Sequence, residues 1–166
     1  MEKRFEYEFA LKEYEKFCKY IREKGFRCDA SGSLRRERED VGDIDVVIEG
    51  TEEIVLEAVG QYPQIEKAIT RYEFILKSGI CIHAIPETKE KYVYTLWHST
   101  GPKAHVKFIE GVYAEKGTEI DEENISEEEI YHKIDLDYMK PAKRYKFQEV
   151  EDDQGGKSQK DNKNIK

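Results

Sequence analysis

Two aspartates separated by a single residue, Asp43 and Asp45, lead into a run of branched apolar residues, Val46, Val47 and Ile48. Alternate side chains of an extended strand point to the same face, so the two carboxylates are expected side by side. Adjacent carboxylates repel each other unless a cation lies between them, and Mg²⁺ favours one or two carboxylates together with substrate phosphates. The pair therefore predicts a site for Mg²⁺ or Mn²⁺, although an isolated pair of this kind is more often a solvated strand face.

A loop with phosphate-binding character precedes these aspartates. Gly32 would let the backbone approach a ligand, Ser33 offers a hydroxyl and an amide at the start of a helical turn, and Arg36 adds a positive charge. By itself a Gly-Ser sequence is an ordinary loop. Together with Asp43 and Asp45 it predicts one site for a nucleotide phosphate and a metal ion.

The combined pattern resembles a known signature. The sequence G-S-L-R-R at 32–36, followed by D-I-D-V-V-I at 43–48, is similar to the nucleotidyltransferase superfamily, and most of all to the palm of family X, polymerase beta-like, DNA polymerases. The similarity covers roughly residues 26–145. Further matching segments occur in the family's order, namely the hairpin strand Ile80–Pro86, the Thr-Gly turn within Trp97–Pro102, and the closing segment Glu127–Pro141.

This resemblance implies metal-dependent transfer of a nucleotide to a nucleic-acid 3′-hydroxyl, as in DNA repair synthesis. Asp43 and Asp45 would be the catalytic residues and would bind the metal. The implied partners are a nucleoside triphosphate and DNA, and the oligomeric state stays open. The resemblance assigns nucleotide binding to five residues, which are Gly32, Ser33, Arg36, Thr100 and Gly101.

One departure concerns the third catalytic carboxylate of the family, whose position falls on Cys81. Cys81 is either a plain strand hydrophobe, left after catalysis was lost, or a ligand that joins His83 and the two aspartates around a softer ion such as Zn²⁺ or Mn²⁺. The missing carboxylate predicts weak catalysis. The alternative function is a degenerate palm that acts as a nucleotide-, DNA- or protein-binding regulatory module.

The charge of the chain is unevenly distributed. The net charge of the 166 residues is -8, and residues 115–137 alone hold ten acidic and two basic side chains. The remainder is therefore neutral, so contact with DNA is expected to be local and weak. An acidic lobe favours the regulatory alternative, since a surface that grips duplex DNA should be neutral or basic.

The predicted fold class is α/β (α+β), with a nucleotidyltransferase-type palm over 1–86, a small mainly helical thumb-like lobe over 87–148 and a disordered tail over 149–166. No apolar run is long enough for a signal peptide or a membrane span, which predicts a cytoplasmic, intracellular protein without a membrane partner. His98 and His105 are expected to be solvated. The expected helices are 5–24, ended by Gly25, 51–61, 102–117 and 126–134, with a helical turn at 34–38, and Ser126 and Glu129 are expected to form a capping box. The expected strands are 26–30, 43–48, 65–70, 72–77 and 80–85. Ser78 and Gly79 are expected to join the last two strands as a hairpin, and the first helix and the helix after Thr51 to pack on the sheet.

Overall fold

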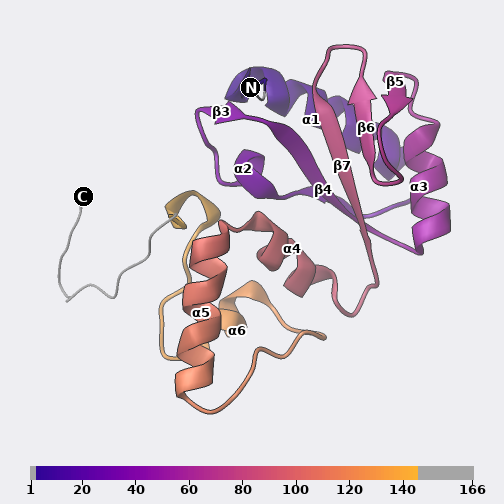
Figure 1. The fold of residues 1–166 in the computed structure, drawn as a ribbon. Coiled ribbons are helices and arrows are strands. Elements are labelled where there is room, and N and C mark those ends of the chain that lie inside the picture. Colours follow the sequence, from indigo (N-terminus) through magenta and orange to yellow (C-terminus); the bar gives the residue numbers. More distant parts are fainter. Residues whose placement is uncertain (1–2, 146–166) are drawn as a thin grey trace.

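The computed structural model describes residues 3–145, which form a mixed α/β protein (Figure 1). The predicted tail, and the last residues of the predicted C-terminal lobe, lie outside this range. No helix within it is long and apolar enough to cross a membrane. The strands are β1 Phe5–Glu6, β2 Cys28–Ala30, β3 Asp40–Val41, β4 Asp43–Glu49, β5 Ile65–Ala68, β6 Glu73–Leu76 and β7 Cys81–Glu87. The helices are α1 Tyr7–Glu23, α2 Gly32–Arg35, α3 Glu52–Gly60, α4 Tyr92–Thr100, α5 Lys103–Glu115, α6 Glu127–His132 and the 3₁₀ helix Pro141–Lys143.

A five-stranded mixed sheet forms the centre of the N-terminal half, in the order β2-β4-β7-β6-β5. β4 and β7 run parallel, and the pairs β2-β4, β6-β7 and β5-β6 are antiparallel. Ser78 and Gly79 connect β6 to β7, which confirms the predicted hairpin. β4 therefore lies between β7, which pairs with it along Asp43–Glu49, and β2, which pairs only with Val46–Ile48.

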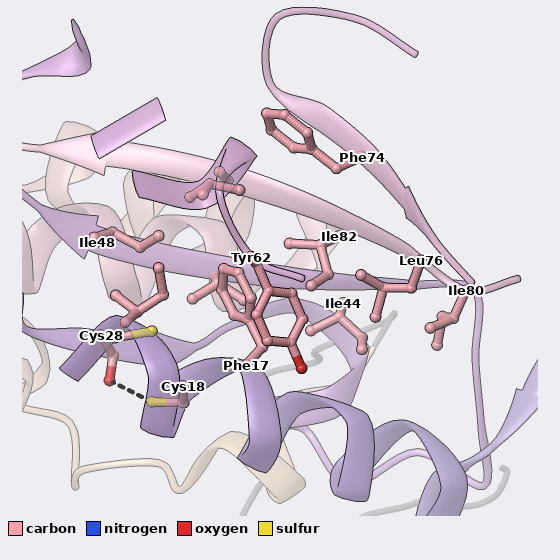
Figure 2. Close-up of a cluster of buried hydrophobic side chains, with 14 of the residues drawn as sticks. Phe17, Cys18, Cys28, Ile44, Ile48, Tyr62, Phe74, Leu76, Ile80 and Ile82 are labelled. Atoms are coloured by element: carbon pink, nitrogen blue, oxygen red, sulfur yellow. Dashed lines mark hydrogen bonds between the residues drawn. The ribbon is translucent and has the colours of Figure 1, made fainter. Parts of the chain in front are cut away.

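One face of this sheet packs against α1 and α3. Ile44, Val46 and Ile48 of β4 belong to a buried cluster that also contains Phe17 of α1 and Val55 of α3 (Figure 2). The alternation of a strand explains why every second residue of β4 enters this cluster. The prediction that the first helix and the helix after Thr51 pack on the sheet is confirmed.

The opposite face of the sheet is covered by α4. Val47 of β4 forms a second buried cluster with Tyr92 and Leu96 of α4, and Ile85 of β7 packs against it. The Tyr92 hydroxyl donates to Asp29 Oδ2 at 2.7 Å and to the Val47 carbonyl at 3.1 Å. These contacts pack the start of the C-terminal half against one face of the sheet. The side chains of the odd-numbered residues of β4 point to this face.

The C-terminal half has a core of its own around α5 and α6. Trp97, Ile109, Tyr113 and Tyr131 are buried there together. The predicted capping box at the start of α6 is confirmed, because Ser126 and Glu129 exchange both side-chain-to-backbone hydrogen bonds. Two separate cores are consistent with a division near residue 86, which stays a prediction.

Some sequence-based expectations about local structure were wrong. The first helix begins at Tyr7 instead of residue 5, because Phe5 pairs with Val41 in a short antiparallel sheet. The helical turn expected at 34–38 spans Gly32–Arg35. α4 was not predicted as a helix. His105 is fully buried and lies 2.8 Å from the Tyr131 hydroxyl, whereas His98 is exposed as expected.

Candidate functional site

Asp43 and Asp45 lie on the same face of β4, at its N-terminal end. Val47 continues this face, and it packs against α4 on the side away from the main core. The parallel register pairs Asp43 with Cys81 and Asp45 with His83. Four polar side chains from two adjacent strands therefore point to one side of the sheet, which agrees with the alternation expected from the sequence.

The backbone of the Gly-Ser loop lies directly against Asp45. The Ser31 amide donates to the Asp45 carbonyl at 2.8 Å, and Gly32 follows with a φ of +61°. A Cβ at Gly32 would lie 2.2 Å from Asp45 Oδ2, far inside van der Waals contact. Glycine is favoured there, because another residue would strain the left-handed backbone and its Cβ would displace the Asp45 carboxylate. The loop is therefore in direct contact with Asp45.

Arg36 is brought together with Thr100 and Gly101, as the predicted nucleotide-binding set requires. Its Nη1 donates to the Thr100 carbonyl at 2.5 Å and lies 3.4 Å from the position of a Cβ on Gly101. Burial and the neighbouring Arg38 lower the pKa of Arg36, while the charge of Asp45 acts in the opposite direction. Within residues 3–145 its buried Nε makes no hydrogen bond. Arg36 therefore holds the Thr-Gly turn through its contact with Thr100.

The two serines of the loop have different surroundings. Ser33 is half-buried, and its carbonyl accepts from the Arg38 amide at 3.1 Å. Ser31 is fully buried, and its Oγ has no hydrogen-bond partner among the described residues. Ser31 was not predicted as a site residue. The only feature of the sequence that could have drawn attention to Ser31 is its position, one residue before Gly32.

His83 contacts one of the predicted catalytic residues. Its Nδ1 lies 3.1 Å from Asp45 Oδ1, and the two side chains are 40% and 28% exposed. The hydrogen bond to Asp45 raises the pKa of His83, against the effect of burial. Because one oxygen of Asp45 faces His83 and the other faces Gly32, its carboxylate is held between the loop and β7.

Cys81 occupies the position where the family resemblance requires a third carboxylate. Burial, with a further contribution from the charge of Asp43, raises the pKa of the Cys81 thiol to about 11. A thiol with this pKa is neutral at pH 7 and adds no third negative charge beside the aspartates. Among the described residues, no group of three or more His, Cys, Asp or Glu side chains is arranged to hold a metal ion. This finding gives no support to the idea of a softer metal held by Cys81 and His83.

The first arginine of the G-S-L-R-R sequence, Arg35, points to the C-terminal half. Arg35 binds both carboxylate oxygens of Glu127 at 2.8 Å and donates to Thr100 Oγ1 at 3.0 Å. Glu127 also lies 3.5 Å from Arg144, which is fully buried and packs over the rings of Tyr131 and Tyr138. These contacts were not predicted, since the sequence favoured Arg36 as the important arginine of the pair.

The donor set suits a hard divalent cation bound together with an anionic substrate. Asp43 and Asp45 supply carboxylate oxygens, which Mg²⁺ prefers, and a site with only two such groups is completed by phosphate oxygens and water. The close approach of Gly32 leaves that side of Asp45 lined by backbone. Comparison with known proteins adds nothing to this geometry: no protein-family model matches the chain, and the search of curated proteins finds no match.

Proposed function

We propose that this protein is a metal-dependent nucleotidyltransferase with a palm similar to that of family X DNA polymerases. Its expected reaction is transfer of a nucleotide from a nucleoside triphosphate to a nucleic-acid 3′-hydroxyl. The observation that carries the proposal is the close approach of Gly32 to Asp45, which joins the Gly-Ser loop and the aspartate pair in one site. The resemblance of the sequence had connected these two segments only by their order.

In this proposal Asp43 and Asp45 would bind Mg²⁺. When bound, the ion would neutralise phosphate charge and lower the pKa of the attacking hydroxyl. The remaining contribution of the protein is positioning, which dominates catalysis in phosphoryl transfer. Gly32 would admit the triphosphate close to the backbone, and His83 would fix the orientation of the Asp45 carboxylate through its hydrogen bond.

Arg36 and Arg35 would have different roles. Arg36 holds the Thr100 carbonyl, so it would keep the Thr-Gly turn beside the nucleotide. Both terminal nitrogens of Arg35 donate hydrogen bonds, to Glu127 and Thr100. We therefore expect Arg35 to hold the two halves of the protein together instead of contacting a phosphate.

A regulatory, non-catalytic module is the second candidate function. Cys81 stands beside Asp43 in the parallel register, so this strand offers no third carboxylate to activate the hydroxyl. The acidic segment is weaker support than the sequence suggested, because two of its acids have structural roles. Glu127 pairs with Arg35, and Glu129 completes the capping box of α6.

The experiment that tests the proposal is incorporation of labelled nucleotides on a gapped DNA duplex with Mg²⁺ or Mn²⁺. We expect slow incorporation by the unmodified protein and none by Asp45→Ala. Asp137→Ala is the matched control, because Asp137 is exposed on the C-terminal half. Incorporation that survives Asp45→Ala would refute the assigned site. Absence of incorporation by the unmodified protein, together with metal-dependent triphosphate binding, would favour the regulatory candidate.

A further inference from the structure

Two cysteines from different elements meet in the main core. Cys18 of α1 and Cys28 of β2 are 2% and 1% exposed, and Cys18 Sγ lies 3.5 Å from the Cys28 carbonyl oxygen. Both side chains belong to the same buried cluster. Figure 2 shows the two sulfur atoms within one cluster, with the hydrogen bond from Cys18 to the Cys28 backbone dashed. This pair is therefore different from an isolated buried cysteine.

The groups around Cys18 favour its ionised form. Tyr14 and the positively charged Arg22 lie beside Cys18 on α1. Arg22 Nη2 donates to the Cys28 carbonyl at 2.7 Å, which fixes the guanidinium beside the pair. As a thiol, Cys18 donates to the same carbonyl; as a thiolate, it can accept from the Cys28 thiol and from Tyr14. Asp29 opposes ionisation through its negative charge.

The three cysteines of the chain differ in acidity. The hydrogen bond from Cys28 lowers the pKa of Cys18, with help from Tyr14 and Arg22 and against the effect of burial and of Asp29. The same hydrogen bond, together with burial, raises the pKa of Cys28, and burial raises that of Cys81. Because the thiolate is the reacting form of cysteine, Cys18 is the most reactive of the three wherever a reagent can reach it.

A surface pocket provides that access. It has a volume of about 410 Å³ and lies along α1. Cys18 lines it and Cys28 does not, so a small reagent that enters the pocket meets Cys18 first. The residues that line it are Tyr14, Glu15, Cys18, Lys19, Arg22 and Glu23.

We propose that Cys18 and Cys28 form an oxidation site, where a hydroperoxide that enters the α1 pocket converts the two thiols into a disulfide between α1 and β2. In the first step the Cys18 thiolate attacks the peroxide, the O–O bond breaks, and a Cys18 sulfenic acid and hydroxide form. In the second step the Cys28 sulfur displaces the sulfenic oxygen, which leaves as water. The two thiols are oxidised, and one hydrogen peroxide is reduced to two waters.

The disulfide would act on the element that leads into the candidate site. β2 pairs with β4 along Cys28–Ala30, and Ser31 and Gly32 follow directly. A covalent link from α1 to Cys28 would restrain this strand and raise the melting temperature by several degrees. This inference does not rest on the proposed function, because neither its chemistry nor its test involves a nucleotide.

The test is treatment of the folded, reduced protein with one equivalent of hydrogen peroxide, followed by intact-mass measurement and peptide mapping. We expect a loss of two hydrogen atoms, a Cys18–Cys28 linked peptide, and Cys81 still open to alkylation. The disulfide should form equally in Cys81→Ser, which is the matched control. A reductant should restore the original mass and the original melting temperature.

A second variant separates the two steps. In Cys28→Ser, Cys18 should stop at the sulfenic acid, which a 1,3-dione reagent traps as a covalent adduct. Oxidation of Cys81 before Cys18 would overturn the proposal, as would folded protein whose Cys18 and Cys28 stay reduced while Cys81 reacts. Circular dichroism before and after treatment establishes that the reacting protein is folded.

Discussion

Arg35 and Glu127 form a bidentate ion pair, with both N–O distances at 2.8 Å, although 92 positions separate them in the sequence. Arg35 ends α2, which begins at Gly32, and Glu127 begins α6. The pair therefore connects the loop at the candidate site to the core of the C-terminal half. Such a contact fixes the relative position of the two halves at a point close to the predicted nucleotide-binding residues.

Replacement of Glu127 should be strongly destabilising. Glu127→Gln leaves Arg35 and the fully buried Arg144 without their carboxylate partner, and breaking a buried pair in this way costs about 3–5 kcal/mol. Denaturant unfolding followed by circular dichroism measures the loss. Glu128→Gln is the matched control, because Glu128 is exposed and should change stability by less than about 0.5 kcal/mol. Equal stability of the two variants would contradict a structural role for the pair.

The ion pair between Arg35 and Glu127 should make the free energy of unfolding depend on pH. Burial alone would raise the pKa of Glu127, but the hydrogen bonds and charge of Arg35 outweigh it, so the folded pKa lies below the ordinary value of 4.5. A lowered folded pKa contributes stability that is fully present above the unfolded pKa and is lost as pH falls through the folded one. The difference in unfolding free energy between the unmodified protein and Glu127→Gln should therefore be constant from pH 7 to about 5 and shrink at lower pH. A difference that grows on acidification would contradict a lowered pKa of Glu127 in the folded protein.

Gly32→Ala should damage both the fold and the site. The added Cβ would meet Asp45 Oδ2, and a left-handed backbone costs a non-glycine residue about 1–2 kcal/mol. The loss of triphosphate-binding free energy should exceed the loss of unfolding free energy, because the Asp45 carboxylate must move. Gly111→Ala in α5 is the control: a Cβ there meets nothing within 4 Å, so a gain of about 0.5–1 kcal/mol is expected. Unchanged binding in a folded Gly32→Ala protein would argue against the role of this loop.

Cys81→Asp distinguishes the two candidate functions. If the protein is an enzyme that lacks only the third carboxylate, the change should raise Mg²⁺-dependent incorporation by about tenfold or more, since each 1.4 kcal/mol of transition-state stabilisation gives a factor of ten. If the site serves only binding, the new charge should merely repel Asp43 and lower stability at neutral pH. Cys81→Asn is the control for side-chain size without charge. Undetectable activity in a folded Cys81→Asp protein would favour the regulatory candidate.

The sequence predicted those features of the fold that depend on neighbouring residues. The alternation of Asp43 and Asp45 with apolar residues predicted their common face, and the Ser126-Glu129 spacing predicted the capping box of α6. Gly25, with a φ of +96°, follows the end of the first helix as expected. In each case the determining interactions span only a few residues, so periodicity and capping rules apply.

Long-range contacts could not be predicted in this way. His105 is one of several polar residues on a helix, and its burial depends on Tyr131, 26 residues later. α4 has a buried face that includes Tyr92 and Leu96, but it is only 9 residues long and no capping side chain marks its start. Its place follows from the packing of Tyr92 and Leu96 on Val47. At the candidate site, the distances from Gly32 and His83 to Asp45 are likewise set by strand pairing and not by local sequence.

The central claim is that Asp43 and Asp45 bind a divalent metal together with a nucleoside triphosphate. Calorimetric titration with a non-hydrolysable triphosphate, with and without Mg²⁺, tests it most directly. Asp43→Asn with Asp45→Asn should abolish the metal-dependent binding. Asp40→Asn with Asp135→Asn, which removes the same charge from two exposed positions, should leave it unchanged. Equal metal-dependent binding by the unmodified protein and the Asp43/Asp45 double variant, with the fold intact, would contradict the assignment of the site.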